Sequence, residues 1–219
     1  MAHSSDSSSP IAILDDDKNV RDGLAYAIES DEWEPIDQPG PLGTMEDFLA
    51  RNIGAVGAVS DHKLAPAGYA QFTGAQLVAA WYRRMFPALL CTTYNKSAVD
   101  EFRSLRRWIP VVMPPDGLTP DTLGVGLELV RKEQQGDFVA ERRPWRAVVR
   151  FTDYAPENRT VYAKLAGWSS EAVALREVDL PDALREIVTR KPDFLCHAEA
   201  NLGTVSGDEL YLSAWEFEA

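Results

Sequence analysis

The chain has 219 residues, 45% of them hydrophobic, with 34 acidic against 22 basic side chains and a formal net charge of −12. This composition excludes a disordered chain, and no apolar run approaches the roughly 20 residues that a membrane-spanning helix needs. A surface this acidic repels phosphate backbones, so nucleic acid is not expected as a partner.

The first residues, "MAHSSDSSSP", are polar and lack the apolar segment of a secretory signal. We interpret residues 1–9 as a disordered tail and expect a cytoplasmic protein. Cys91 and Cys196 each sit in an apolar stretch, which favours buried free thiols, with a disulfide as the alternative. The three histidines are scattered and predict no structural zinc site.

Residues 10–136 alternate short apolar runs with helical patterns. Strands are predicted at 11–14, 33–37, 53–60, 88–92 and 109–113, and helices at 19–30, 44–50, 74–86, 97–108 and 119–136. In the first helix, Val20, Leu24 and Ile28 recur every fourth residue and predict its buried face. Five strand–helix units in succession predict an α/β domain with a five-stranded parallel sheet between helices.

After Gly136 the pattern changes. Residues 137–143 read as a linker, and residues 144–219 as a second domain. Strands are predicted at 145–154, 159–168, 172–180, 193–202 and 209–218, with one helix at 180–188. This pattern predicts a small, mostly antiparallel β-barrel or sandwich, with an OB-like barrel among the alternatives, that serves as an interaction domain.

Polar residues follow three of the strands predicted in the first domain. Asp15, Asp16 and Asp17 follow the first strand, Asp61 the third and Thr92 the fourth. Because the carboxyl ends of parallel strands meet at one sheet edge, we expect these side chains to lie close together. A hard cation such as Mg²⁺ relieves the repulsion between clustered carboxylates, and an ionised aspartate can attack phosphorus. Each residue alone is weak support, since polar strand ends commonly serve turns and helix caps.

Residues 10–136 resemble the CheY-like, flavodoxin-like receiver domain of bacterial two-component response regulators. The resemblance is carried by "ILDDDKNVRDGL", "AVSDHKLAPAGYAQFTGAQLV" and "LLCTTYN". It implies that Asp61 is the phosphoacceptor and that Thr92 hydrogen-bonds the phosphoryl group. It also implies a Mg²⁺ ion held by Asp15, Asp16, Asp61 and the backbone carbonyl of Lys63.

The resemblance implies a phosphorelay protein rather than an enzyme. Its phosphoryl donor would be a sensor histidine kinase or a phosphotransfer protein, and its output would pass to a downstream protein partner. The sequence leaves a homodimer open. No helix-turn-helix pattern follows the first domain.

The stretch "PVVMPPD" (110–116) departs from the family pattern. The family's strand-five lysine aligns with Pro114, and the strand-five aromatic residue aligns with Val111. Proline has neither a charge nor an N–H group, so a charge-assisted hydrogen bond typically worth ~1.5–3 kcal/mol is lost. We expect phosphorylation to change residues 109–136 less than the loops after the third and fourth strands. Lys63 and Lys96 could each swing a cation towards the pocket, but we interpret both as solvated surface lysines.

Two interpretations remain open for the acidic residues. In one, Mg²⁺ and Asp61 still support phosphoryl transfer, because the metal and positioning dominate that chemistry. In the other, the domain is a pseudo-receiver that acts as a phosphorylation-independent adaptor. A third alternative, a nucleic-acid-binding regulator, rests on the basic clusters 103–108 and 141–146, which we interpret as solvated. We expect His62 at the surface or against a helix, and His197 in the core.

Overall fold

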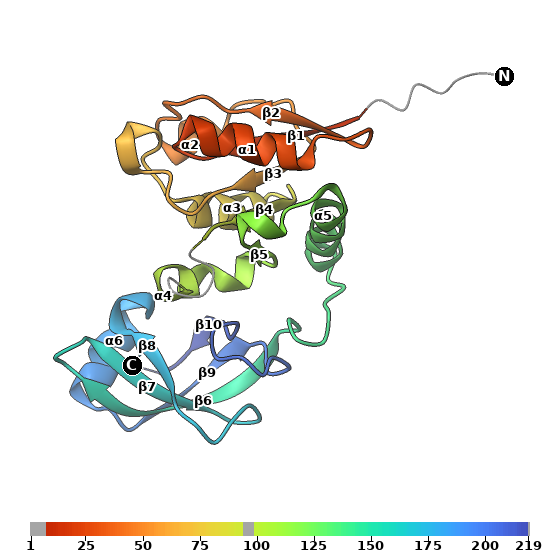
Figure 1. Cartoon of the computed structure of the whole chain (residues 1–219). Coiled ribbons are helices and arrows are strands. Elements are labelled where there is room, and N and C mark those ends of the chain that lie inside the picture. Colours follow the sequence, from red (N-terminus) through yellow and green to blue (C-terminus); the bar gives the residue numbers. More distant parts are fainter. Residues whose placement is uncertain (1–7, 94–98, 219) are drawn as a thin grey trace. The chain divides into compact units, whose positions relative to one another are not determined.

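The computed structural model describes residues 8–93 and 99–218, which form two compact units (Figure 1). The first unit comprises residues 8–93 and 108–137, and the second comprises residues 99–107 and 138–218. The sequence pattern predicts residues 99–107 to lie inside the first domain. In the structure they are part of the second unit, which is therefore discontinuous in sequence.

The first unit is built on a parallel sheet of five strands in the order β2-β1-β3-β4-β5. This doubly wound order is shared by flavodoxin and CheY, and the predicted receiver-like fold class is confirmed. The strands are β1 (Ser9–Leu14), β2 (Trp33–Asp37), β3 (Gly57–Ser60), β4 (Ala88–Cys91) and β5 (Val112–Met113). The helices are α1 (Lys18–Ile28), α2 (Met45–Leu49), α3 (Gly74–Arg83) and α5 (Pro120–Gln134), with 3₁₀ turns η1 (Pro66–Gly68) and η3 (Pro115–Gly117).

Helices α1 and α5 pack on one face of this sheet. Leu24 and Ile28 of α1 and Leu123 and Leu127 of α5 share a core with strand residues such as Ile13. Helices α2 and α3 contact each other through the rings of Phe48 and Trp81, whose centroids are 6.0 Å apart. Helix α3 also packs against β3 and β4, and every residue of these two strands is buried, as their unbroken apolar sequences require.

The buried face of α1 differs from the predicted one. Arg21, Leu24 and Ile28 are buried, whereas Val20 is 40% exposed. Positions 21, 24 and 28 also lie on one side of a helix, so the spacing alone permits either face. The strand preceding α1 begins at Ser9, inside the segment predicted as a tail, while residues 1–7 lie outside the described residues.

Helix α3 begins with a reciprocal capping box. The hydroxyl of Thr73 accepts a hydrogen bond from the backbone N–H of Gln76, and the Gln76 side chain accepts one from the N–H of Thr73. We expect Thr73→Ala to lower the free energy of unfolding by about 1 kcal/mol in urea denaturation. Gln71→Ala, at an exposed position outside the box, is the control. Equal stability of the two variants would show that the box contributes nothing.

The second unit is built on an antiparallel sheet of five strands in the order β10-β9-β6-β7-β8. The predicted mostly antiparallel β domain is confirmed. Its strands are β6 (Trp145–Ala155), β7 (Thr160–Leu165), β8 (Val173–Arg176), β9 (Phe194–Ala200) and β10 (Leu212–Glu216). Its helices are α4 (Val99–Phe102), η2 (Arg103–Trp108), η4 (Glu177–Asp179) and α6 (Asp182–Arg190); the last residue of η2, Trp108, belongs to the first unit.

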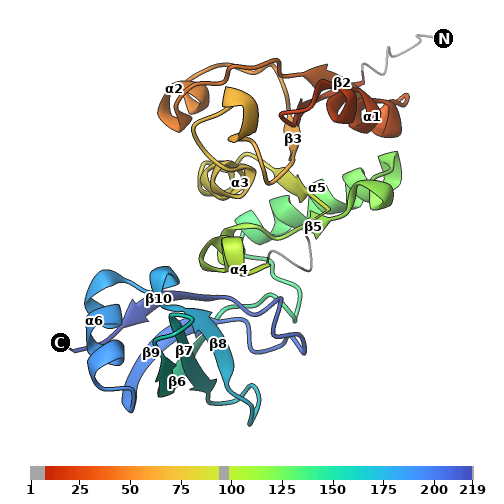
Figure 2. The same ribbon diagram turned by 60° about the vertical axis from the view of Figure 1, so that its left-hand side comes forward.

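Helix α6 covers one face of the second sheet (Figure 2). Leu184 and Val188 of α6 pack against strand residues that alternate along the sheet, among them Val149, Phe151 and Val161. Among the described residues, no helix is both long and apolar enough to cross a membrane.

Candidate functional site

The polar residues singled out in the sequence lie at one edge of the parallel sheet. Asp15 follows β1, Asp61 follows β3 and Thr92 follows β4, so the shared strand direction brings them to the same edge. Asp15 and Thr92 are buried, and Asp61 is half-buried. The backbone N–H of Asp61 donates to the carbonyl of Leu14 at 2.8 Å, which ties the end of β3 to the end of β1.

The carboxyl group of Asp15 is under electrostatic strain. Burial raises its pKa to about 6, and the negative charges of Asp61 and Asp16 add to this rise. A 2.8 Å hydrogen bond from the backbone N–H of Asp17 acts in the opposite direction. Asp61 and Asp16 therefore lie within electrostatic range of the Asp15 carboxyl group.

The loop that carries Asp61 is held by short-range contacts. One Asp61 carboxylate oxygen accepts a 2.6 Å hydrogen bond from the backbone N–H of Lys63. The N–H of Gly74 donates to the carbonyl of His62 at 2.8 Å. A Cβ atom on Gly74 would lie 1.6 Å from the carbonyl oxygen of Asp61, so this position leaves room for glycine alone. The Thr73–Gly74 turn thus fixes the backbone of the candidate phosphoacceptor.

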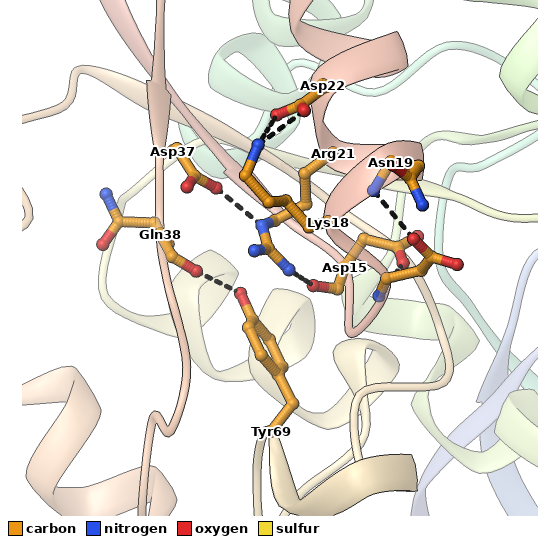
Figure 3. A network of polar contacts seen from close by, with 9 residues as sticks. Asp15, Lys18, Asn19, Arg21, Asp22, Asp37, Gln38 and Tyr69 are labelled. Carbon is orange, nitrogen blue, oxygen red and sulfur yellow. Dashed lines mark hydrogen bonds and ion pairs between the residues drawn. The ribbon is translucent and has the colours of Figure 1, made fainter.

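An arginine that the sequence analysis missed holds the backbone of Asp15 (Figure 3). The guanidinium of Arg21 donates to the carbonyl oxygen of Asp15 and to the carboxylate of Asp37, both at 2.6 Å. Its carbon lies 5.3 Å from the centroid of the Tyr69 ring, and the Tyr69 hydroxyl donates to the carbonyl of Gln38. The spacing of Arg21 from Leu24 and Ile28 puts all three on one face of α1, and this spacing is the sequence pattern that indicates a buried Arg21.

The oxygen-rich donor set suits Mg²⁺, but the carboxylates are not gathered around one point. Among the residues that the structure describes, no three His, Cys, Asp or Glu side chains are grouped closely enough to hold a metal ion. The carboxylate of Asp15 accepts a hydrogen bond from the backbone N–H of Asp17, and that of Asp61 accepts one from the N–H of Lys63. The residues fit Mg²⁺ by chemistry and charge, and binding would require their side chains to rotate.

The end of β5 carries a negative charge near this edge. Pro114 has an extended backbone (φ −75°, ψ 155°) and leads into η3, which contains the exposed Asp116. Burial raises the pKa of the Cys91 thiol to about 12, and the charges of Asp61, Asp15 and Asp116 all contribute to the rise. Asp116, two residues after Pro114, is therefore within electrostatic range of Cys91 at the end of β4. Lys96 lies outside the described residues.

The structure shows the burial of two of the histidines and of both cysteines, for which the sequence made predictions. His62 is 3% exposed, so the surface position predicted as one alternative is wrong. His197 is half-buried, and because its neighbours Cys196 and Ala198 face the core of the second unit, strand alternation puts His197 on the other face. The predicted core position is wrong. Cys91 and Cys196 are buried free thiols, as predicted.

The basic clusters predicted to be solvated are mostly buried. Arg103, Arg106 and Arg107 of η2, and Arg142 of the segment before β6, are each 7–8% exposed. The interpretation of 103–108 as a solvated helix face is therefore wrong. Their burial reduces the exposed basic surface on which the nucleic-acid alternative rested, while Arg143 and Arg146 stay exposed.

The sequence matches no protein-family model, and a search of curated proteins finds no match. Solved structures with similarity include a CheY-like receiver domain protein from Methanospirillum hungatei, with 21% identity and a TM-score of 0.42 over 60% of this chain and 99% of that one. A receiver domain protein from Clostridium thermocellum has 11% identity and a TM-score of 0.41 over 58% and 97%.

NtrX from Brucella abortus, solved in complex with ADP, has 15% identity and a TM-score of 0.42 over 59% of this chain. The matched part spans only 28% of the NtrX chain, and 57% of the response regulator ChrA. The fold assignment of the first unit rests on the strand order given above.

Proposed function

We propose that the protein is an atypical response regulator whose first unit accepts a phosphoryl group on Asp61. The observation that carries this proposal is the electrostatic coupling of Asp15 and Asp61 at the strand-end edge of the sheet, beside the buried Thr92. A buried carboxyl group whose pKa is raised by burial and by neighbouring negative charges is costly to keep ionised without a bound cation, so Asp15 favours a functional site over a structural one.

In the proposed reaction, a carboxylate oxygen of Asp61 forms a bond to the phosphorus of a phosphohistidine on a kinase or phosphotransfer protein. The phosphorus–nitrogen bond of the donor breaks, and its electron pair stays with the imidazole nitrogen, leaving an acyl phosphate on Asp61. The hydroxyl of Thr92 donates a hydrogen bond to a phosphoryl oxygen. The backbone contacts of Asp61 with Leu14 and Lys63 orient the nucleophile.

Asp15, Asp16, Asp61 and the carbonyl of Lys63 would hold Mg²⁺. When bound, this ion would offset the negative charge of the carboxylates and of the transferring phosphoryl group. The second unit then serves as an interaction domain for a downstream protein partner.

One observation favours a second candidate function, a phosphorylation-independent adaptor. Asp116 adds to the negative charge that acts on Cys91 at the end of β4, and Pro114 supplies no lysine charge to offset it. Repulsion between this carboxylate and an incoming phosphate would slow the transfer.

Intact-protein mass spectrometry after incubation with acetyl phosphate and Mg²⁺ separates the two functions. We expect wild-type protein to gain one phosphoryl group, and to gain none when EDTA replaces Mg²⁺. Asp61→Asn keeps the shape of the side chain but not its nucleophilic charge, and we expect it to stay unmodified. Asp116→Asn is expected to be modified faster than wild type, because it removes the opposing charge.

An adduct that persists in Asp61→Asn would place the phosphoryl group elsewhere. If neither wild-type protein nor Asp116→Asn is modified by any phosphodonor, the adaptor function is the correct one.

A further inference from the structure

The second unit contains a short helical segment that, in sequence, connects two strands of the first unit. The segment comprises α4 and residues 103–107 of η2, between β4 and β5; we call residues 103–107 the crossover anchor. Three of its five side chains are arginines with 7–8% exposure. Arginine is rarely buried without partners, because removing its charge from water is costly.

Arg142 binds the carboxyl end of η2. Its guanidinium donates to the carbonyl oxygen of Arg107 at 3.1 Å and to that of Arg106 at 3.4 Å. The last carbonyls of a helix have no partner within the helix and carry partial negative charge. Arg142 therefore acts as a C-terminal cap supplied by the segment that precedes β6.

Arg103 makes the converse contact at the start of η2. Its guanidinium donates to the carbonyl of Gly207 at 2.6 Å and to that of Leu210 at 3.3 Å. Both carbonyls belong to the connection between β9 and β10. Arg103 of the crossover anchor thus binds carbonyls of the connection between β9 and β10. In turn, Arg142 of the segment before β6 binds carbonyls of the anchor.

Tyr211 joins these contacts. Its ring centroid lies 5.6 Å from the guanidinium carbon of Arg107 and 5.3 Å from that of Arg142. Its hydroxyl donates to the carbonyl of Arg142 at 2.6 Å, and its own N–H donates to the side chain of Asn201 at 2.8 Å. Tyr211 is fully buried. The connection between β9 and β10 therefore contacts the anchor through Tyr211, against Arg107, and through Gly207, which binds Arg103.

We propose that the crossover anchor is the element through which the state of the acidic edge is passed to the second unit. In sequence the segment lies between Thr92, which directly follows β4, and β5, whose Met113 carbonyl accepts a hydrogen bond from the N–H of Thr92 at 2.9 Å. The lost contacts at Pro114 and Val111 are then not needed for output. The direction of this signal rests on the proposed function, whereas the coupling itself does not.

The coupling is tested first without any ligand, by amide hydrogen exchange on the full chain. Arg142→Gln removes the cap of η2, while Arg143→Gln removes the same charge at the neighbouring exposed position. We expect Arg142→Gln to speed exchange at least about tenfold in residues 103–108 and 201–211, and also to speed it at Thr92. Arg143→Gln should match wild type at all three.

Faster exchange at 201–211 with Thr92 unchanged would overturn the coupling, and so would equal effects in the two variants. Circular dichroism checks that the variants fold. Should Arg142→Gln fail to fold, Tyr211→Phe replaces it, because it removes only the hydroxyl contact to Arg142, and the same pattern is expected at smaller amplitude.

The direction of the signal is tested with Mg²⁺ and beryllofluoride, a phosphoryl mimic. In wild type we expect altered exchange at 61–75 and at 201–211, and in Arg142→Gln at 61–75 alone. Altered exchange at 201–211 that survives in Arg142→Gln would overturn the proposed route. If 61–75 does not respond in wild type, the phosphoacceptor function fails, and the ligand-free comparison still decides the coupling.

Discussion

Gly74→Ala is expected to lower the free energy of unfolding by about 3 kcal/mol or more and to reduce phosphoryl uptake on Asp61. The added Cβ atom would lie 1.6 Å from the carbonyl oxygen of Asp61 and 2.6 Å from the Ser60 hydroxyl. The first of these is a backbone atom, so the loop must move. Overpacking of this kind typically costs 1–3 kcal/mol, and more where the backbone must shift.

Gly23→Ala in α1 is the matched control. An added Cβ atom at Gly23 meets nothing within 4 Å, so alanine should stabilise this helix by about 0.5–1 kcal/mol. Urea denaturation measures both variants, and acetyl phosphate labelling measures the effect on Asp61. If the two variants are equally stable, the close approach of Gly74 to Asp61 is wrong.

Asp15→Asn is expected to raise the free energy of unfolding of the metal-free protein at pH 7.5 by up to about 2–3 kcal/mol. The pKa of the Asp15 carboxyl is about 6 in the folded protein against an ordinary value of 3.8, and each pKa unit corresponds to about 1.4 kcal/mol. Asparagine keeps the oxygen that accepts from the Asp17 N–H but carries no charge.

The sign of the pH dependence follows from the raised pKa. Between about pH 4 and pH 6 the folded state holds the Asp15 proton more tightly than the unfolded state, so wild type loses stability as the pH rises through this window. The Asp15→Asn variant has no carboxyl group at this position, so it does not lose stability in this way as the pH rises. Its advantage should be absent near pH 4 and complete above pH 6.

Asp17→Asn is the control for Asp15→Asn. It removes an equal charge at the exposed N-cap of α1, where asparagine caps as well as aspartate. Urea denaturation in EDTA across this pH range tests the prediction. A gain of the same size in Asp17→Asn would show that net charge, rather than the buried position of Asp15, is responsible.

The sequence predicts the fold of the first unit well because its signals are local. Apolar runs mark the buried strands, Thr119 and Pro120 mark the start of α5, and aspartates mark two strand ends. In a parallel sheet the strand ends share an edge, so a linear pattern specifies which of these residues meet. The positions of Asp15, Asp61 and Thr92 follow from this rule.

The contacts of the arginines could not be predicted in the same way. Arg21 and Val20 are both compatible with the helical spacing of α1, and packing decides between them. Arg103 and Arg142 are buried because they bind carbonyls and rings that lie far away in sequence. A run of arginines is commonly solvated. The sequence of the run does not indicate which distant residues will bind these arginines in the folded protein.

Amide exchange of wild-type protein in Mg²⁺, with and without beryllofluoride, tests most directly whether the acidic edge signals through the crossover anchor. The account predicts altered exchange at residues 61–75 and 201–211, with α5 nearly unchanged, because Pro114 and Val111, which flank β5, offer neither a charge nor an aromatic ring to a phosphoryl group. Changes along α5 as large as those at 61–75, with residues 201–211 unchanged, would contradict it.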